Sequence, residues 1–364
     1  MTGGWYAPGK GSRSGVADYA ETLFHALRQF GAWEPPVYHI GNNRLHETIY
    51  ARALATPGVA ILHDAVLHHF LLGTLSREEY IAEFVYNYGE WRRHMAEELW
   101  EERASSGIDP RYFEYPMLKR VVERSRAVVV HNPGAASMAR AHGASKVFVI
   151  PHFFDPGIPP GTSPGMPPDG AAIAYFRQKI EVGQGATLFG IFGYLRETKR
   201  ILPCIRAFRR LNAQRPGAAL LLAGDAVSPD LDRLLQSEAA HPAIHRLGYL
   251  GERDLPTAAA AIDCCLNLRY PAAGETSGIA VRMMGAGKPV MVTAGAETAD
   301  IPPSACLRVQ SGVAEAAELF DHMVLVSEFP EIARQIGGAA RRHILEHHTL
   351  AVVARQYWQV LCAV

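Results

Sequence analysis

The chain has 364 residues, of which 48% are apolar and 20% are charged, and its formal net charge at pH 7 is +0. Chains longer than ~250–300 residues usually divide into domains, so we expect two hydrophobic cores. The balanced charge gives no general attraction to nucleic acid or to an anionic membrane. The N-terminal residues lack an apolar signal segment, and no apolar run approaches the ~20 residues that cross a bilayer. We therefore expect a cytoplasmic protein that binds no nucleic acid, and we leave peripheral membrane contact and the oligomeric state open.

The cysteines are odd in number and show no CxxC pairing. They are Cys204, Cys264, Cys265, Cys306 and Cys362. This pattern predicts buried free thiols in a reducing compartment rather than a disulfide framework.

In the first half of the chain, short apolar runs typical of strands alternate with helical patterns. Strands are expected at 5–7, 37–40, 59–62, 127–130 and 147–150, and helices at 16–28 and 134–142. This βαβ alternation predicts a parallel sheet with helices on both faces. Between 73 and 126 the strand pattern is absent, and an amphipathic, aromatic-rich pattern at 78–100 predicts a helical insertion. Its aromatic residues either join the core or face a cleft.

A proline-rich stretch, Pro156 to Asp169, predicts a linker to a second alternating series. Strands are expected there at 186–192, 219–223, 244–247, 264–268 and 290–292, and helices at 201–213, 229–240, 254–262 and 279–285, with a helical tail at 330–361. We therefore predict an α/β protein with two doubly wound, Rossmann-like domains, residues 1–160 and 161–345. The carboxyl ends of their strands should face one central cleft.

The most informative motif is Gly274-Glu275-Thr276-Ser277-Gly278, between an expected strand and an expected helix. A loop at a helix N-terminus offers free backbone N–H groups, here beside two hydroxyls, and the positive end of a dipole; these can hold a phosphate. The Glu275 carboxylate would be repelled by phosphate, so we expect it to bind a neutral hydroxylated group such as a sugar. The motif therefore predicts a nucleotide-sugar site.

Cations cluster in a second motif, Gly193 to Arg200, after the first strand of the second series. Positive charges at a helix N-terminus oppose the helix dipole, so their presence there needs a reason. Facing a cleft, Arg196, Lys199 and Arg200 could clamp a diphosphate and offset the charge on a departing phosphate. The structural alternative is a solvated helix start.

Two more motifs follow strands of the first series. The loop Gly9 to Gly15 opens a helix and either approaches a diphosphate or sugar or forms a flexible turn; it does not have Walker spacing and fits the dinucleotide fingerprint poorly. His63 and Asp64, with His68 and His69, lack HExxH spacing, so no metal site is predicted. His63 could hydrogen-bond a sugar, and Asp64 could simply cap the following turn.

Together these stretches resemble retaining glycosyltransferases of family 4, which have the GT-B fold, and the resemblance covers nearly the whole chain. Ser14 to Tyr19 resembles the loop SGIADY, in which Gly15 approaches the donor phosphate; Ile61 to Asp64 resembles the strand-end HD; and Phe192 to Arg200 resembles the FG…KR clamp. Gly248, Tyr249 and Leu250 lie in a segment similar to the one whose backbone meets the nucleobase. GETSG followed by GAGKPV resembles the donor-sugar loop of one branch of the family. Residues 346–364 resemble the C-terminal helix that crosses back onto the first domain.

Two positions depart from the family pattern. Arg282 stands where the family usually has a second glutamate that binds the ribose hydroxyls, so it either faces a phosphate or is structural. Tyr194 occupies the usual arginine position of the clamp, just after Gly193. Arg196 or Arg200 could substitute for that arginine.

The resemblance implies a retaining, metal-independent hexosyltransferase of polysaccharide biosynthesis. It needs no cofactor and moves a sugar from a nucleotide-diphosphate sugar, UDP- or GDP-linked, to a hydroxyl of a glycan, a lipid-linked acceptor or a small glycoside. Lys199, with Arg196 or Arg200, would stabilise the leaving diphosphate, Glu275 would position the sugar, and His63 would support it. The other expected donor-binding residues are Gly15, Gly193, Gly248, Tyr249, Leu250, Thr276, Ser277 and Gly278. The alternatives are a catalytically degenerate scaffold protein and a nucleotide-sugar epimerase of similar fold.

Overall fold

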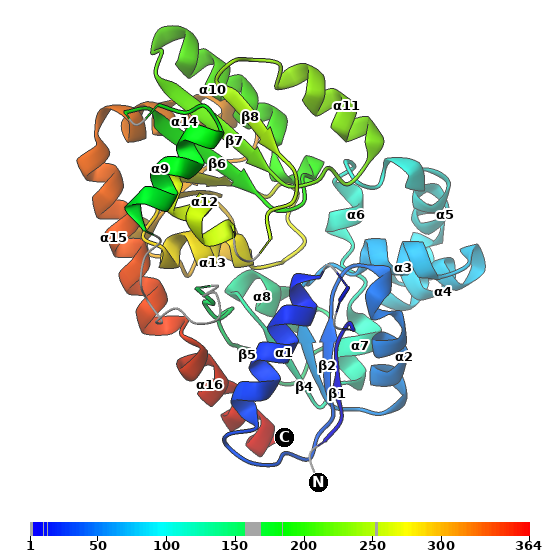
Figure 1. Cartoon of the computed structure of the whole chain (residues 1–364). Coiled ribbons are helices and arrows are strands. Elements are labelled where there is room, and N and C mark those ends of the chain that lie inside the picture. Colours follow the sequence, from blue (N-terminus) through cyan, green and yellow to red (C-terminus); the bar gives the residue numbers. More distant parts are fainter. Residues whose placement is uncertain (1–2, 10, 13, 157–168, 184, 252–253) are drawn as a thin grey trace.

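The computed structural model describes residues 3–9, 11–12, 14–156, 169–183, 185–251 and 254–364. These residues form two α/β domains, each built around its own parallel sheet (Figure 1). The predicted fold class is therefore confirmed. Most of the predicted linker, Pro156 to Asp169, lies outside the described residues.

The first sheet has the strand order β1-β2-β3-β4-β5, and all neighbouring strands are parallel. The strands are β1 (Trp5–Tyr6), β2 (Val37–Ile40), β3 (Val59–Leu62), β4 (Ala127–Val130) and β5 (Val147–Val149). The helices that accompany them are α1 (Gly15–Leu27), α2 (Glu47–Ala55), α7 (Lys119–Arg124) and α8 (Pro133–Ala141). Strands β2, β3 and β4 are buried at every position, which accounts for their largely apolar sequences, since helices cover both faces of such a sheet.

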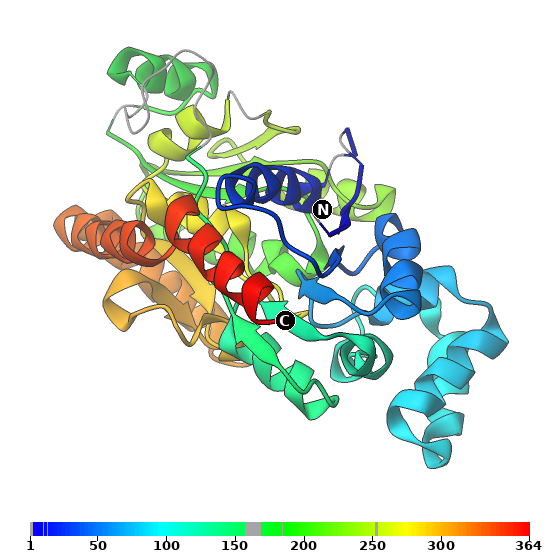
Figure 2. The same ribbon diagram turned by 90° about the horizontal axis from the view of Figure 1, so that it is seen from below.

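The insertion consists of short helices rather than one long one. They are α3 (His68–Thr74), α4 (Arg77–Tyr88), α5 (Arg93–Glu101) and α6 (Arg111–Glu114). The helical pattern at 78–100 breaks at Gly89, whose φ of 91° ends α4 in a conformation that glycine adopts readily. Tyr80 and Phe84 are buried in the core of the first domain, whereas the Trp91 side chain stays 75% exposed. Figure 2 shows the insertion projecting from one side of this domain.

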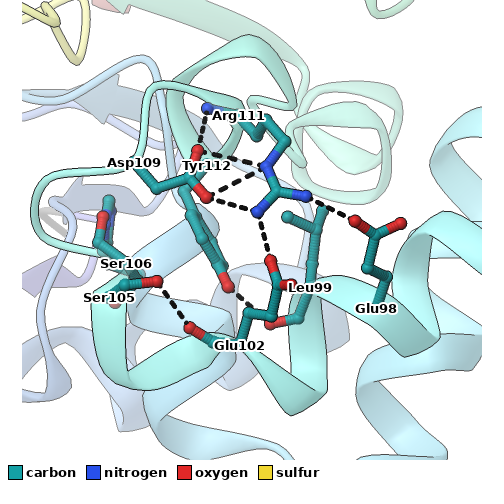
Figure 3. Close-up of polar contacts among 9 residues, drawn as sticks. Glu98, Leu99, Glu102, Ser105, Ser106, Asp109, Arg111 and Tyr112 are labelled. Carbon is teal, nitrogen blue, oxygen red and sulfur yellow. Dashed lines mark hydrogen bonds and ion pairs between the residues drawn. The ribbon is translucent and has the colours of Figure 1, made fainter.

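Arg111 ties α6 to the rest of the insertion (Figure 3). Its guanidinium forms ion pairs with Asp109, Glu98 and Glu102, and the Glu98 contact is 2.7 Å long. The neighbouring Tyr112 hydroxyl donates a hydrogen bond of 2.5 Å to the Leu99 carbonyl. These contacts fix α6, which carries part of the cavity wall described below.

The second sheet has the strand order β11-β10-β9-β6-β7-β8 and is also parallel throughout. Its strands are β6 (Thr187–Phe192), β7 (Ala218–Ala223), β8 (Ile244–Leu247), β9 (Cys264–Asn267), β10 (Val290–Thr293) and β11 (Leu307–Val309). Its helices are α9 (Gly170–Lys179), α10 (Ile201–Gln214), α11 (Pro229–Glu238), α12 (Leu255–Ala261), α13 (Gly278–Gly285), α14 (Glu315–Glu328) and α15 (Pro330–His347). The sequence did not lead us to expect β11, α9 or α14.

The last helix, α16 (Leu350–Ala363), packs against the first domain. Figure 1 shows it in red beside α1 in blue. The hydroxyls of Tyr357 and Tyr19 lie 3.1 Å apart, and the Trp358 and Phe30 rings stack with centroids 5.8 Å apart. The polypeptide therefore crosses between the two domains twice, once after β5 and once between α15 and α16.

Candidate functional site

The loop between β9 and α13 touches the first domain directly. The N–H groups of Ala65 and Val66, just after β3, both donate to the Ala273 carbonyl, at 2.8 and 3.0 Å. Gly274 adopts a φ of 72°, and a β-carbon on it would lie 2.6 Å from the Ala65 β-carbon. Only glycine fits both this backbone conformation and this approach. The motif that the sequence singled out is therefore held by both domains.

Asn132, directly after β4, forms the second half of this contact. Its Oδ1 accepts from the Ala135 N–H at 2.8 Å and so caps α8. Its Nδ2 donates to the Gly274 carbonyl and to Thr276 Oγ1, both at 3.0 Å. The buried Asn132 amide thus joins the start of α8 in the first domain to the β9–α13 loop of the second.

The start of α13 lies next in this loop. Ser277 is its N-cap, and its hydroxyl accepts from the Ala280 N–H at 3.3 Å. The first N–H groups of α13, beginning with Gly278, supply the positive end of the helix dipole. The two predicted hydroxyls are therefore already in use, one as a cap and one as a hydrogen-bond acceptor for Asn132.

Lys199 ends the short 3-10 helix Glu197–Lys199 that follows β6, and it is almost fully buried, with 8% of the residue exposed. Its ammonium donates to the Phe192 carbonyl at 2.5 Å. Burial holds the Lys199 pKa well below its usual value, and the nearby charges of Arg269 and Arg196 lower it further. The positive charge of Lys199 is therefore costly to maintain until an anion binds beside it.

Arg269 was not predicted from the sequence. It follows β9, and its Nε lies 3.2 Å from Glu275 Oε1. Its Nη1 donates to the Leu268 carbonyl at 2.8 Å, and its Nη2 reaches Ser277 Oγ at 3.4 Å. Its position in the sequence could have identified it. Arg269 lies just past a buried strand, where parallel sheets carry ligand-binding residues, and six residues before Glu275.

Glu275 and Asp64 bring two carboxylates to the same place from opposite domains. Glu275 accepts from the Ala273 N–H at 2.8 Å through Oε2 and faces Arg269 through Oε1. Burial and the charge of Glu275 raise the Asp64 pKa to about 6, although the Asn42 N–H, Arg196 and Arg269 act in the opposite direction. Asp64 is thus part of the charged site and not only a turn former.

The other clamp candidate, Arg200, is held elsewhere. It adopts a left-handed φ of 57°, and its guanidinium binds the buried Glu315 carboxylate through contacts of 2.7 to 3.0 Å. The arginines whose charges lower the Lys199 pKa are Arg269 and Arg196.

Arg282 lies 3.7 Å from the Asp155 carboxylate, in the segment that leaves the first domain. Its charge also contributes to lowering the pKa of His152, to about 3, although burial is the largest cause. Tyr194 is 38% exposed at the end of β6. Both departures from the family pattern are thus located, and Arg282 pairs with the connection between the domains.

His63 belongs to a buried histidine cluster that we define as His39, His63, His131 and His152. His63 Nε2 lies 3.0 Å from His39 Nδ1, and Tyr19 packs among the rings of His63, His131 and His152. Burial lowers the pKa of all four, to about 3 for His39 and about 4 for His131. His63 is therefore a neutral imidazole at physiological pH, which can both donate and accept a hydrogen bond.

The structure also places other residues that the sequence predicted to bind the nucleotide sugar. Gly15 begins α1, Gly193 directly follows β6, and the Tyr249 N–H after β8 donates to Asp225 Oδ1 at 3.2 Å. A cavity of about 610 Å³ lies between the ends of β7 and β8 and is lined in part by Asp225 and Gly248. Lys10 and Arg13, in the loop before α1, lie outside the described residues.

A second cavity, of about 360 Å³, lies between the domains. Phe113 and Glu114 of α6 form its wall on one side, and Arg269, Glu275 and Thr276 form part of the other. Its volume lies within the range of small-molecule sites. The insertion therefore supplies the cavity wall opposite the β9–α13 loop.

Three general expectations can be set beside the described residues. All five cysteines are free, and four are buried; the prediction of a buried thiol is wrong for Cys362, which is exposed. Within the described ranges, no group of three or more His, Cys, Asp or Glu side chains has the geometry to hold a metal ion. The same ranges contain no helix long and apolar enough to cross a membrane.

Comparison with known proteins finds one family model that matches part of the second domain, and solved structures with the same fold. Residues 186–337 match the family model described as Glycosyl transferases group 1. The structure of Anabaena HepE in complex with UDP-glucose is similar over 100% of both chains, with a TM-score of 0.66 and 15% identity. WaaG, a glycosyltransferase involved in lipopolysaccharide biosynthesis, is similar over 98% of this chain and 99% of its own, with a TM-score of 0.65 and 13% identity. A search of curated proteins found no match.

Sucrose-phosphate synthase from Thermosynechococcus elongatus is also similar, over 95% of this chain and 78% of its own, with a TM-score of 0.61 and 16% identity. These identities are low, so the structural likeness establishes a shared fold of two Rossmann-like domains, the GT-B arrangement. The particular branch with a GETSG loop stays a prediction.

Proposed function

We propose that this protein is a retaining glycosyltransferase that uses a nucleotide-diphosphate sugar. One observation carries the proposal: Arg269 lies 3.2 Å from Glu275 and 3.4 Å from the N-cap hydroxyl of α13, and the charges of Arg269 and Arg196 act both on the buried Lys199 and on Asp64 of the other domain. Cations at a helix N-terminus suit a diphosphate, and a carboxylate next to them suits sugar hydroxyls. The family match of residues 186–337 supports the same assignment.

In this proposal the donor lies along the carboxyl ends of the second sheet. Its base meets the backbone of Gly248 to Leu250, its diphosphate lies between Lys199 and α13, and its sugar meets Glu275. HepE, which shares the fold, was solved in complex with UDP-glucose, so a UDP-sugar is the first donor to test and a GDP-sugar the second.

The proposed reaction needs no dedicated base. The bond between the anomeric carbon and the phosphate oxygen breaks while the acceptor oxygen bonds to the same face of that carbon. The acceptor proton passes to the departing phosphate oxygen. Lys199 and Arg196 offset the charge that builds on the diphosphate, and the neutral His63 hydrogen-bonds the sugar. Contact between the domains would exclude water and so limit hydrolysis.

The acceptor would enter beside the insertion, where Phe113 and Glu114 line the cavity between the domains. We further propose that the reaction is metal-independent, that it takes place in the cytoplasm, and that its product belongs to a glycan, a glycolipid or a small glycoside.

The test is a panel of UDP-, GDP-, ADP- and TDP-sugars in a thermal-shift assay, followed by a hydrolysis assay with each donor that stabilises the protein. A ligand present at 100 times its dissociation constant stabilises the folded state by ~2.7 kcal/mol. We expect stabilisation by at least one donor and slow release of its nucleoside diphosphate. Stabilisation by none of the four donor classes would contradict the proposal.

A degenerate scaffold is the second candidate, favoured by Tyr194 in place of the clamp arginine and by the pairing of Arg282 with Asp155. A scaffold that has lost its chemistry would bind nucleotide without releasing it from any sugar donor. The same panel therefore separates the two functions.

A further inference from the structure

Arg269 is the charged group of the site that neither the sequence motifs nor the family resemblance identifies. Its side chain is 19% exposed and lies between Glu275, 3.2 Å away, and Ser277 Oγ, 3.4 Å away. A guanidinium has five N–H donors in one plane, so it can bind a carboxylate along one edge and a second anion along another. The contact with the neutral Ser277 hydroxyl is long, and that edge faces the N-cap of α13.

The charge of Arg269 also acts on Lys199. After burial, it is the largest cause of the lowered Lys199 pKa, ahead of Arg196. Two partly dehydrated cations repel each other, and an anion between them converts that repulsion into attraction. Glu275 pairs with Arg269, and Asp64 adds a second carboxylate from the other domain, so two carboxylates stand against the three side chains Arg196, Lys199 and Arg269. The site therefore has room in its charge balance for one further anion.

Arg200, which the sequence also offered for the diphosphate clamp, cannot take this role. Arg200 is bound by the buried carboxylate of Glu315, and Tyr194 brings no charge to the end of β6. A diphosphate bound at the start of α13 would need a cation on the β9 side as well as on the β6 side. Arg269 is positioned there by its own bond to the Leu268 carbonyl.

We propose that Arg269 binds the donor diphosphate together with Lys199, while its other edge holds Glu275 in place for the sugar. This inference rests on the proposed function, because it names the donor as the missing anion. It assigns two separable tasks to one side chain. The charge serves the diphosphate, and the planar fork serves Glu275.

The experiment compares Arg269→Gln and Arg269→Lys with the parent protein by calorimetric titration. The ligands are the mono- and diphosphates of uridine, guanosine, adenosine and thymidine. Glutamine keeps one N–H donor near the position of Nε, which faces Glu275, but loses the charge and both Nη groups; lysine keeps the charge without the fork. Arg177→Gln is the matched control. Arg177 is a largely buried arginine that donates to two main-chain carbonyls, those of Ala261 and Ala186, and pairs with Asp263, which precedes β9, whereas Arg269 follows it.

Arg269→Gln should weaken diphosphate binding ~10–100-fold, the range expected for a lost charge-assisted contact, and change monophosphate binding less than ~3-fold. Arg269→Lys should keep diphosphate affinity within ~3-fold and still lower kcat, because Glu275 loses its partner. Arg177→Gln should change neither affinity.

A folded Arg269→Gln protein with the parent's diphosphate affinity would overturn the role of Arg269 and leave the proposed function intact. Equal losses for mono- and diphosphate, or an equal loss in Arg177→Gln, would also overturn it, since these outcomes indicate a general structural effect. If Arg269→Gln does not fold, an Arg269→Lys protein with strongly reduced diphosphate affinity contradicts the proposal. A parent protein that binds none of the diphosphates would instead contradict the proposed function itself.

Discussion

Asn132 gives the sharpest test of how the two domains share the donor loop. Its side chain makes three hydrogen bonds: one caps α8 at Ala135, and two cross to Gly274 and Thr276. Loss of an N-cap costs ~1 kcal/mol, and each further hydrogen bond contributes ~1 kcal/mol. Asn132→Ala should therefore lower the free energy of unfolding by about 3 kcal/mol.

Asn132→Asp separates the two tasks. Aspartate keeps the oxygen that caps α8 but loses both donors that cross between the domains, and it places a carboxylate against the Gly274 carbonyl. The expected loss is about 2 kcal/mol in urea unfolding. Because the loop then loses its anchor, affinity for the nucleotide sugar should fall ~10-fold, as for a change of ~1.4 kcal/mol. An Asn132→Asp protein with unchanged stability and donor affinity would refute the reasoning.

Four further predictions follow from the site. Lys199→Ala should lower kcat ~10²–10³-fold, as for removal of one preorganised charge stabiliser; near-normal turnover in the folded variant would remove Lys199 from the mechanism. Glu275→Gln should lower kcat/KM for the nucleotide sugar ~10–100-fold while hardly changing the affinity for free nucleoside diphosphate, and equal losses for both ligands would contradict sugar binding by Glu275. Activity should persist in excess EDTA, and loss that Mg²⁺ or Mn²⁺ restores would contradict metal independence. The free energy of unfolding, measured in urea between pH 7.5 and 4.5, should fall below pH 6.5, because the histidines of the unfolded chain take up protons there while the buried histidine cluster does not. Asp64, with a pKa raised to about 6, has the opposite effect between pH 6 and 4, but it is one group against four. A free energy of unfolding that does not change with pH would contradict neutral burial of the cluster.

The sequence predicted the sheets because their strands are buried on both faces and therefore apolar throughout. It missed β11, in which Arg308 separates the only two apolar residues, and α9, none of whose residues is fully buried. It joined α4 and α5 because the amphipathic pattern continues across Gly89, whose left-handed φ only the folded chain reveals. The short elements depend on tertiary contacts rather than on local propensity.

The functional residues show the same division. Lys199 and Glu275 stand in recognisable motifs, and the structure brings both beside the start of α13. Arg269 and Asn132 stand alone in the sequence, at the ends of apolar strands. Arg269 matters because it faces Glu275 in the loop that follows, and Asn132 matters because it faces the second domain. The pairing of Arg200 with Glu315 likewise joins residues far apart in the chain, so sequence spacing placed Arg200 and Arg196 on equal terms.

Both domains hold the β9–α13 loop, and this has an energetic consequence. Ala65, Val66 and Asn132 donate hydrogen bonds to the loop from the first domain, and Gly274 permits the approach. Any opening of the domains must break these bonds and leave Glu275 with less support. Donor affinity and contact between the domains are therefore linked, because a ligand that prefers the intact loop stabilises the closed arrangement to the extent of its differential affinity. Closure would then need no separate lid, since the loop that holds the sugar is itself part of the contact.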